Sequence, residues 1–219
     1  MRKILDAIFN FDSPFMLRAS RIASLIILNI LWIICCLPIV TIGPATVAMN
    51  HVIFLYRTEA SDELFKPFFR AFKRDFFQSM LLGIPVTVVC VLLFFNGLYI
   101  YGNYPDQFHP LWIPFTLMLL IIGAVISIGF PMLARYSLTL KQVVNNSLIL
   151  FIQSFPNSLF AMVAHFLPVL VWIFIPTVFA NFAFFWVLIG PSLVAYINNR
   201  KLLTIFDRLQ EEADAQEET

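Results

Sequence analysis

Histidine and cysteine are the residues of this 219-residue chain best suited to metal binding and nucleophilic chemistry. The chain holds His51, His109, His165, Cys35, Cys36 and Cys90. The histidines lie far apart and the cysteines form no Cys-x-x-Cys pair, so neither set has the spacing of a metal site. His51 and His165 fall within apolar runs, where we expect neutral rings that form hydrogen bonds between helices. We predict no metal and no bound cofactor.

Sequence motifs for enzyme chemistry are also absent from the chain. It has no G-x-x-x-x-G-K-[ST] loop to hold nucleotide phosphates, no H-E-x-x-H, no G-x-S-x-G and no paired carboxylates. We therefore expect a chain that binds no nucleotide by itself and is not an enzyme. The net charge of +1 argues against a nucleic-acid partner, which would require a basic surface.

The composition instead indicates an integral membrane protein that lies in a lipid bilayer. Hydrophobic residues make up 60% of the chain and charged residues 12%, against about 45–50% and 25% in soluble domains. Four runs contain no Asp, Glu, Lys or Arg: residues 22–56, 76–105, 107–134 and 142–199. A membrane-spanning helix needs about 20 apolar residues. We predict an all-α, polytopic membrane helix bundle with five to six spans.

The first and last of these runs are too long for one span each, so both must contain a break. We expect spans at about 17–37, 45–56, 77–101, 111–133, 159–178 and 182–197. Pro38, Gly43 and Pro44 are expected to break the first run, because proline and glycine interrupt a helix. The helix at 45–56 is short for a full span and is expected either to cross or to re-enter. Residues 1–209 form a single membrane domain in this interpretation, followed by an acidic cytoplasmic tail at residues 210–219.

The distribution of lysine and arginine predicts how the chain crosses the membrane. The loop at residues 102–110 contains neither residue type and is expected outside, whereas cationic clusters precede and follow the other spans. Four cationic residues lie in the first 21 positions and also favour the inner side. Both conditions are met only by six crossings with both termini cytoplasmic. Five crossings with an external N-terminus are the competing arrangement.

The segment at residues 61–75 has the pattern of an amphipathic helix. Its phenylalanines recur at helical spacing, and its cations occupy the other side. Such a helix commonly anchors itself in the membrane surface. The alternative is a docking surface for a cytoplasmic partner, with these candidate residues: Lys66, Phe68, Phe69, Arg70, Phe72, Lys73 and Arg74.

Polar side chains within the predicted spans bear on transport. The spans contain no Asp, Glu, Lys or Arg, which argues against a proton- or ion-coupled transporter. Asn50, Asn96, Asn181 and Gln78 are the residues available to form hydrogen bonds between helices or to line a path for a neutral solute.

The segment at residues 28–49, followed by the Phe-Phe-Arg-Ala-Phe-Lys-Arg-Asp-Phe helix, resembles the YesL family of small bacterial membrane proteins. The most specific piece is Cys-Leu-Pro-Ile-Val-Thr-Ile-Gly-Pro-Ala at residues 36–45, and the resemblance extends over residues 11–209. It implies a multi-pass protein of the bacterial cytoplasmic membrane, encoded beside carbohydrate importers of the ATP-binding-cassette (ABC) class. It implies no catalytic residue.

Taken together, the residues and the resemblance lead to two functional hypotheses. The first is an accessory or regulatory membrane subunit associated with an ABC-type carbohydrate, specifically oligosaccharide, importer. Its partners would be the permease subunits. The second is a stand-alone facilitator or channel for a neutral solute.

Overall fold

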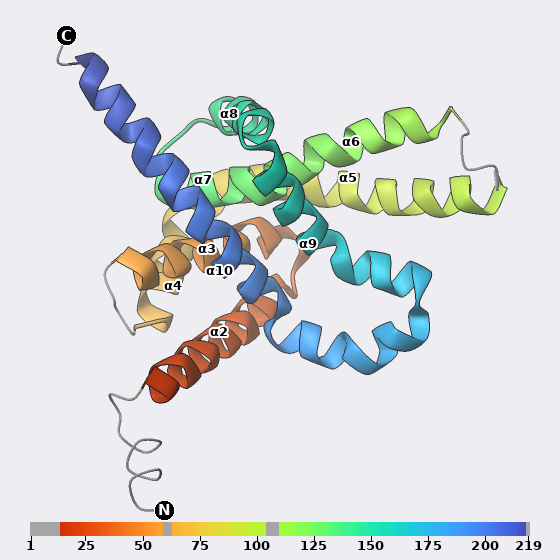
Figure 1. Cartoon of the computed structure of the whole chain (residues 1–219), viewed down its shortest axis with the longest axis horizontal. Helices are drawn as coiled ribbons and strands as arrows, with labels where there is room; N and C mark the ends of the chain where they lie inside the picture. The colour runs from red at the N-terminus through yellow and green to blue at the C-terminus, as the bar shows by residue number, and fades with distance from the viewer. Residues whose placement is uncertain (1–13, 59–62, 104–109, 218–219) are drawn as a thin grey trace, which may run out of the picture.

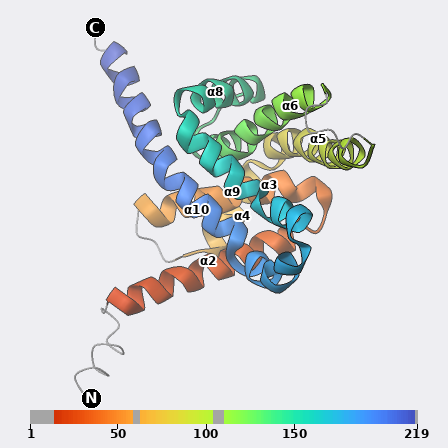
Figure 2. The same ribbon diagram turned by 45° about the vertical axis from the view of Figure 1, so that its right-hand side comes forward.

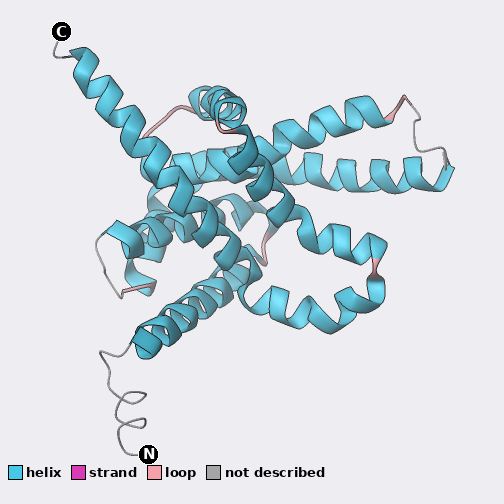
Figure 3. Ribbon diagram, in the orientation of Figure 1, coloured by secondary structure: helices cyan, strands magenta, loops and turns pink. Residues whose placement is uncertain are grey.

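The computed structural model describes residues 14–58, 63–103 and 110–217, and all its regular elements in these ranges are helical (Figures 1 and 3). Two short elements interrupt the α-helices: η1 is a 3-10 turn and η2 is a π-helix. In chain order the elements are α2 (Pro14–Cys36), η1 (Ile39–Thr41), α3 (Ile42–Thr58), α4 (Phe65–Arg74), α5 (Phe76–Asn103), α6 (Trp112–Ala124), η2 (Val125–Gly129), α7 (Phe130–Arg135), α8 (Leu140–Gln153), α9 (Phe155–Phe174) and α10 (Pro176–Glu217).

Five helical segments are long and apolar enough to cross a membrane, and this confirms the predicted fold class. They are Ala19–Cys36, Ile39–Thr58, Phe76–Asn103, Trp112–Arg135 and Ala180–Arg208. A sixth is obtained if α8 and the first part of α9, which are bent by 108°, are counted as one broken span. The chain is thus a polytopic helical membrane protein with five to six candidate spans.

The first charge-free run folds into a helical hairpin made of α2 and α3. Nε1 of Trp32 in α2 donates a hydrogen bond to Oγ1 of Thr46 in α3 (3.1 Å). Further from the turn, Leu28 of α2 and Val52 of α3 line the same small hollow and belong to one buried cluster. The two helices therefore run antiparallel, and the chain returns toward the end from which it started.

The break in this hairpin is narrower than the sequence predicts. Pro38 lies in it, between α2 and η1, but Gly43 and Pro44 are buried in the first turn of α3. Proline is accepted there because the first N–H groups of a helix have no partner within the helix. As a result η1 and α3 together reach 20 residues, long enough to cross.

The turn between the last two helices also differs from its expected position. It falls at Ile175, so that Pro176 is the first residue of α10 and Asn181 lies inside that helix. A proline at the start of a helix loses no hydrogen bond. In Figures 1 and 2, α10 runs past α3 and α2, and it packs against both of them and against α9.

Candidate functional site

The amphipathic segment forms helix α4, and its inner face is part of the protein core. Phe68 is 0% exposed, and Leu64 and Ala71 are buried beside it. All three belong to the cluster that α2 and α3 form with each other. The prediction that Phe68 takes part in docking is therefore wrong: the ring faces the bundle, because burial of a phenylalanine side chain is favourable by about 1.5–3 kcal/mol.

The other candidate residues of α4 divide into two groups. Phe72 is half-buried beside Phe68, with ring centroids 6.3 Å apart, and Arg74 forms an ion pair with Asp75. The remaining candidates are exposed, and one of them, Lys66, also lines a groove between α2 and α4. We call this set the outer face of α4; it consists of Lys66, Phe69, Arg70 and Lys73.

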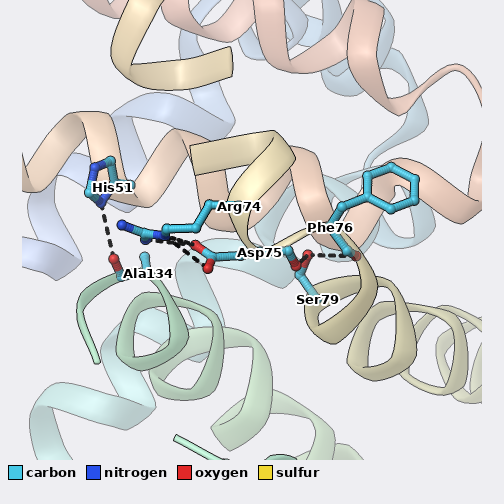
Figure 4. Close-up of polar contacts among 6 residues, drawn as sticks. All are labelled: His51, Arg74, Asp75, Phe76, Ser79 and Ala134. Carbon is cyan, nitrogen blue, oxygen red and sulfur yellow. Dashed lines mark hydrogen bonds and ion pairs between the residues drawn. The ribbon is translucent and has the colours of Figure 1, made fainter. Parts of the chain in front are cut away.

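The junction of α4 and α5 is formed by contacts of Arg74, Asp75 and Ser79 (Figure 4). Nε and a terminal nitrogen of Arg74 donate hydrogen bonds to the two carboxylate oxygens of Asp75, at 3.0 and 2.7 Å. This hydrogen bonding raises the pKa of the Arg74 guanidinium above its ordinary value, so the ion pair is kept. The Asp75 carbonyl accepts from the N–H of Ser79 in α5 (2.9 Å). Asp75 is therefore both the C-terminal cap of α4 and a hydrogen-bond acceptor for the first turn of α5.

His51 lies next to this junction and joins α3 to α7. The Ala134 carbonyl accepts a hydrogen bond from Nδ1 of His51 (3.1 Å), which places the ring proton on that nitrogen (Figure 4). The expectation of a bond between helices is met here. The same expectation is wrong for His165, because its Nδ1 bonds to the carbonyl of Ala161 in the same helix (2.7 Å). Cys35, Cys36 and Cys90 are free thiols and half-buried.

Two prolines inside helices each leave a carbonyl without its usual donor, and an asparagine from another helix supplies one. Pro131 has no N–H for the carbonyl of Ser127, four residues earlier. Nδ2 of Asn198 in α10 donates to that carbonyl (2.5 Å). The backbone at this point is the π-helical turn η2, in which the N–H of Phe130 bonds to the carbonyl of Val125, five residues earlier.

The same arrangement occurs at Pro191 in α10. The carbonyl of Val187, four residues earlier, accepts a hydrogen bond from Nδ2 of Asn29 in α2 (2.6 Å). Oδ1 of Asn29 in turn accepts from the N–H of Ser192 (3.1 Å), and Oγ of Ser192 donates to the Leu25 carbonyl (2.9 Å). These buried bonds fix α2 against α10 in surroundings where an unpaired backbone group would be costly.

Of the four polar side chains considered for a solute path, one connects two helices, one connects α5 to the loop between α7 and α8, and two bond within their own helices. Asn50 accepts a hydrogen bond from Asn199 (2.9 Å), and Gln78 donates to the Leu138 carbonyl. Asn96 and Asn181 are exposed and donate to carbonyls of their own helices. The two grooves between α2, α3 and α4 are lined by none of these four residues.

No three side chains among His, Cys, Asp and Glu come together as metal ligands in the ranges 14–58, 63–103 and 110–217. The described part of the chain is a helical membrane protein, and it carries a short amphipathic helix, α4, that packs against its bundle.

Comparison with known proteins shows that part of this chain is similar to one family. Residues 25–97 match the family model described as "Protein of unknown function, DUF624". The match runs from α2 through α3 and α4 into α5, so it contains the hairpin, the outer face of α4 and the Arg74–Asp75 junction. Searches of curated proteins and of solved structures returned no match.

Proposed function

We propose that this protein is an accessory or regulatory subunit associated with an ABC-type carbohydrate importer. It would lie in the bacterial cytoplasmic membrane with both termini cytoplasmic, carry out no reaction itself, and contact the permease through the outer face of α4. The resemblance to the YesL family supports the importer as the partner. The DUF624 match is consistent with that resemblance, since it contains both the residue 36–45 motif and α4.

The observation that carries the proposal is the way α4 is mounted. A helix that only anchors a protein at the membrane surface turns its apolar side to the lipid. Here the central apolar residue, Phe68, faces the bundle and is fully buried. Lys66, Arg70 and Lys73 project from the opposite side together with Phe69, which is 43% exposed. An exposed aromatic ring beside an arginine, as at Phe69 and Arg70, has the composition of a protein interface.

Charge reversal on the outer face tests this function. In K66E/R70E, two exposed cations become acidic, and we expect recovery of the permease subunits with the tagged protein to fall by on the order of tenfold. The measurement is quantitative co-purification in mild detergent from cells that express the protein at its native level. The matched control is K141E/R208E, which makes the same charge change at exposed positions on α8 and α10.

The proposal fails if the wild-type protein never retains permease subunits, or if K66E/R70E retains as many as the control. The facilitator hypothesis has less support from the structure, because Asn96 and Asn181 are bonded within their own helices. Solute uptake by proteoliposomes that contain only this protein would favour it.

A further inference from the structure

Three arginines from three helices come together at the end of the α2–α3 hairpin. Arg57, in the last turn of α3, stacks on the ring of Tyr196 in α10, and Arg200 lies one helical turn beyond that tyrosine. Arg21 of α2 is a further cationic neighbour of Arg57 and lies one turn before Ser24, which lines a hollow together with Tyr196. The ion pairs found within the described ranges, Arg74–Asp75 and Arg135–Asp207, involve none of the three. Like charges held together in this way repel one another, and a bound anion would remove that repulsion.

The geometry of Arg57 leaves one hydrogen-bond donor unused. Its guanidinium stacks on the ring of Tyr196, with Cζ 3.7 Å from the ring centroid. A terminal nitrogen donates to the carbonyl of the same tyrosine (2.8 Å). Nε is buried and has no partner. Buried donors without partners are rare in folded proteins, so an acceptor that reached this nitrogen would stabilise it.

A mainly apolar groove begins beside Arg21, because Ser20, the residue before it, lines the groove. It has a volume of about 600 Å³ and lies between α2 and the start of α4. Its walls include Ala23 and Ile27 of α2 and Phe65 of α4, and its α4 end is lined by one acidic and one basic residue, Glu63 and Lys66. A smaller hollow shares Ser24 and Leu64 with the groove, and Tyr196 also lines it. Two residues of the groove therefore lie beside the ring on which Arg57 stacks.

We propose that this place binds an anionic phospholipid of the leaflet on the α4 side. The phosphate would lie among Arg21, Arg57 and Arg200, since a guanidinium donates two parallel hydrogen bonds to phosphate oxygens. One acyl chain would lie along the apolar groove. Basic pockets between spanning helices bind anionic headgroups in this way. The groove favours a lipid over a free phosphate ion, because a phosphate ion has no acyl chain to occupy it. The inference does not depend on an importer partner.

The test compares lipid binding by the full-length protein and by R21Q/R200Q. Both arginines are exposed, so their loss leaves the packing of Arg57 on Tyr196 in place. Phosphatidylglycerol is titrated into the protein in detergent, and its binding is followed by thermal stabilisation and by native mass spectrometry. We expect R21Q/R200Q to bind phosphatidylglycerol about 30-fold more weakly than wild type. K73Q/K141Q, which also loses two exposed cations, should bind like wild type.

Three outcomes would overturn the proposal. Equal stabilisation by phosphatidylcholine would show that the headgroup charge is not recognised. Equal stabilisation by inorganic phosphate would show a site for a free anion. Unchanged binding by R21Q/R200Q, or an equal loss in K73Q/K141Q, would show that these arginines are not the site. Lys66 also lines the groove, so the permease co-purification is repeated with R21Q/R200Q, which leaves the outer face of α4 unchanged. Normal recovery of permease subunits together with weakened lipid binding in R21Q/R200Q would separate the two proposals.

Discussion

Replacing Gly43 with leucine is expected to destabilise the protein by about 3 kcal/mol or more. A Cβ at this position would lie 2.1 Å from the backbone carbonyl oxygen of Ser79 and 3.1 Å from Cα of Gly83. Backbone atoms cannot rotate away as a flexible side chain can, so α3 would have to separate from α5. We expect the midpoint of thermal aggregation in detergent to fall by roughly 10 °C. Size-exclusion chromatography after heating measures this midpoint.

Gly102→Leu is the control for this substitution. Gly102 lies near the end of α5, and a Cβ added there meets nothing within 4 Å. Its thermal midpoint should stay within about 2 °C of wild type, because surface substitutions usually change stability by less than about 0.5 kcal/mol. If Gly43→Leu is equally stable, the close approach of α3 and α5 at Gly43 and Gly83 is incorrect.

Phe68→Ala is expected to release α4 from the bundle. Truncation of a buried phenylalanine costs about 3–5 kcal/mol, and here the loss falls on the contact that holds a ten-residue helix. Three cations of this helix are trypsin sites, namely Arg70, Lys73 and Arg74, whereas Lys66 precedes a proline and is not cut. If the free energy of local opening of α4 falls by about 3 kcal/mol, trypsin should cut α4 about a hundredfold faster. Gel electrophoresis of the detergent-purified protein over time measures this rate.

The neighbouring ring provides the control. Phe69 contacts Phe68 edge to face (5.6 Å between centroids) but is 43% exposed on the outer face. Phe69→Ala should leave the rate of tryptic cleavage within about threefold of wild type, because little buried surface is lost. Equal cleavage of the two variants would mean that α4 is not held by Phe68.

The sequence was most informative where a local pattern decides the structure. Charge-free runs predicted the apolar helices, because a span of given length cannot tolerate many charges. The spacing of phenylalanines and cations predicted α4. The same spacing did not show which side of α4 faces the bundle, since an aromatic face fits lipid and protein equally well. This is why Phe68 was taken for a docking residue.

Contacts between distant residues were harder to predict. Gly43 was expected to break a helix, yet it lies within α3, where its missing side chain lets α5 approach. Asn29 and Asn198 were not singled out. A signal for them existed, because Pro131 and Pro191 lie in apolar runs and each must leave a carbonyl in need of a donor. Which asparagine supplies it depends on how the helices pack.

The central structural claim is that α2 and α3 form a hairpin whose two ends lie on the same side of the membrane as α4. Single cysteines at Ser20, Thr58 and Asn103, in a background without the three native cysteines, test it directly. These positions are exposed at the start of α2, the end of α3 and the end of α5. With a membrane-impermeant maleimide on intact cells, we expect Asn103→Cys to be labelled. Ser20→Cys and Thr58→Cys should react only after the membrane is opened. Labelling of Ser20→Cys but not Thr58→Cys in intact cells would mean that the segment crosses once, and would contradict the hairpin.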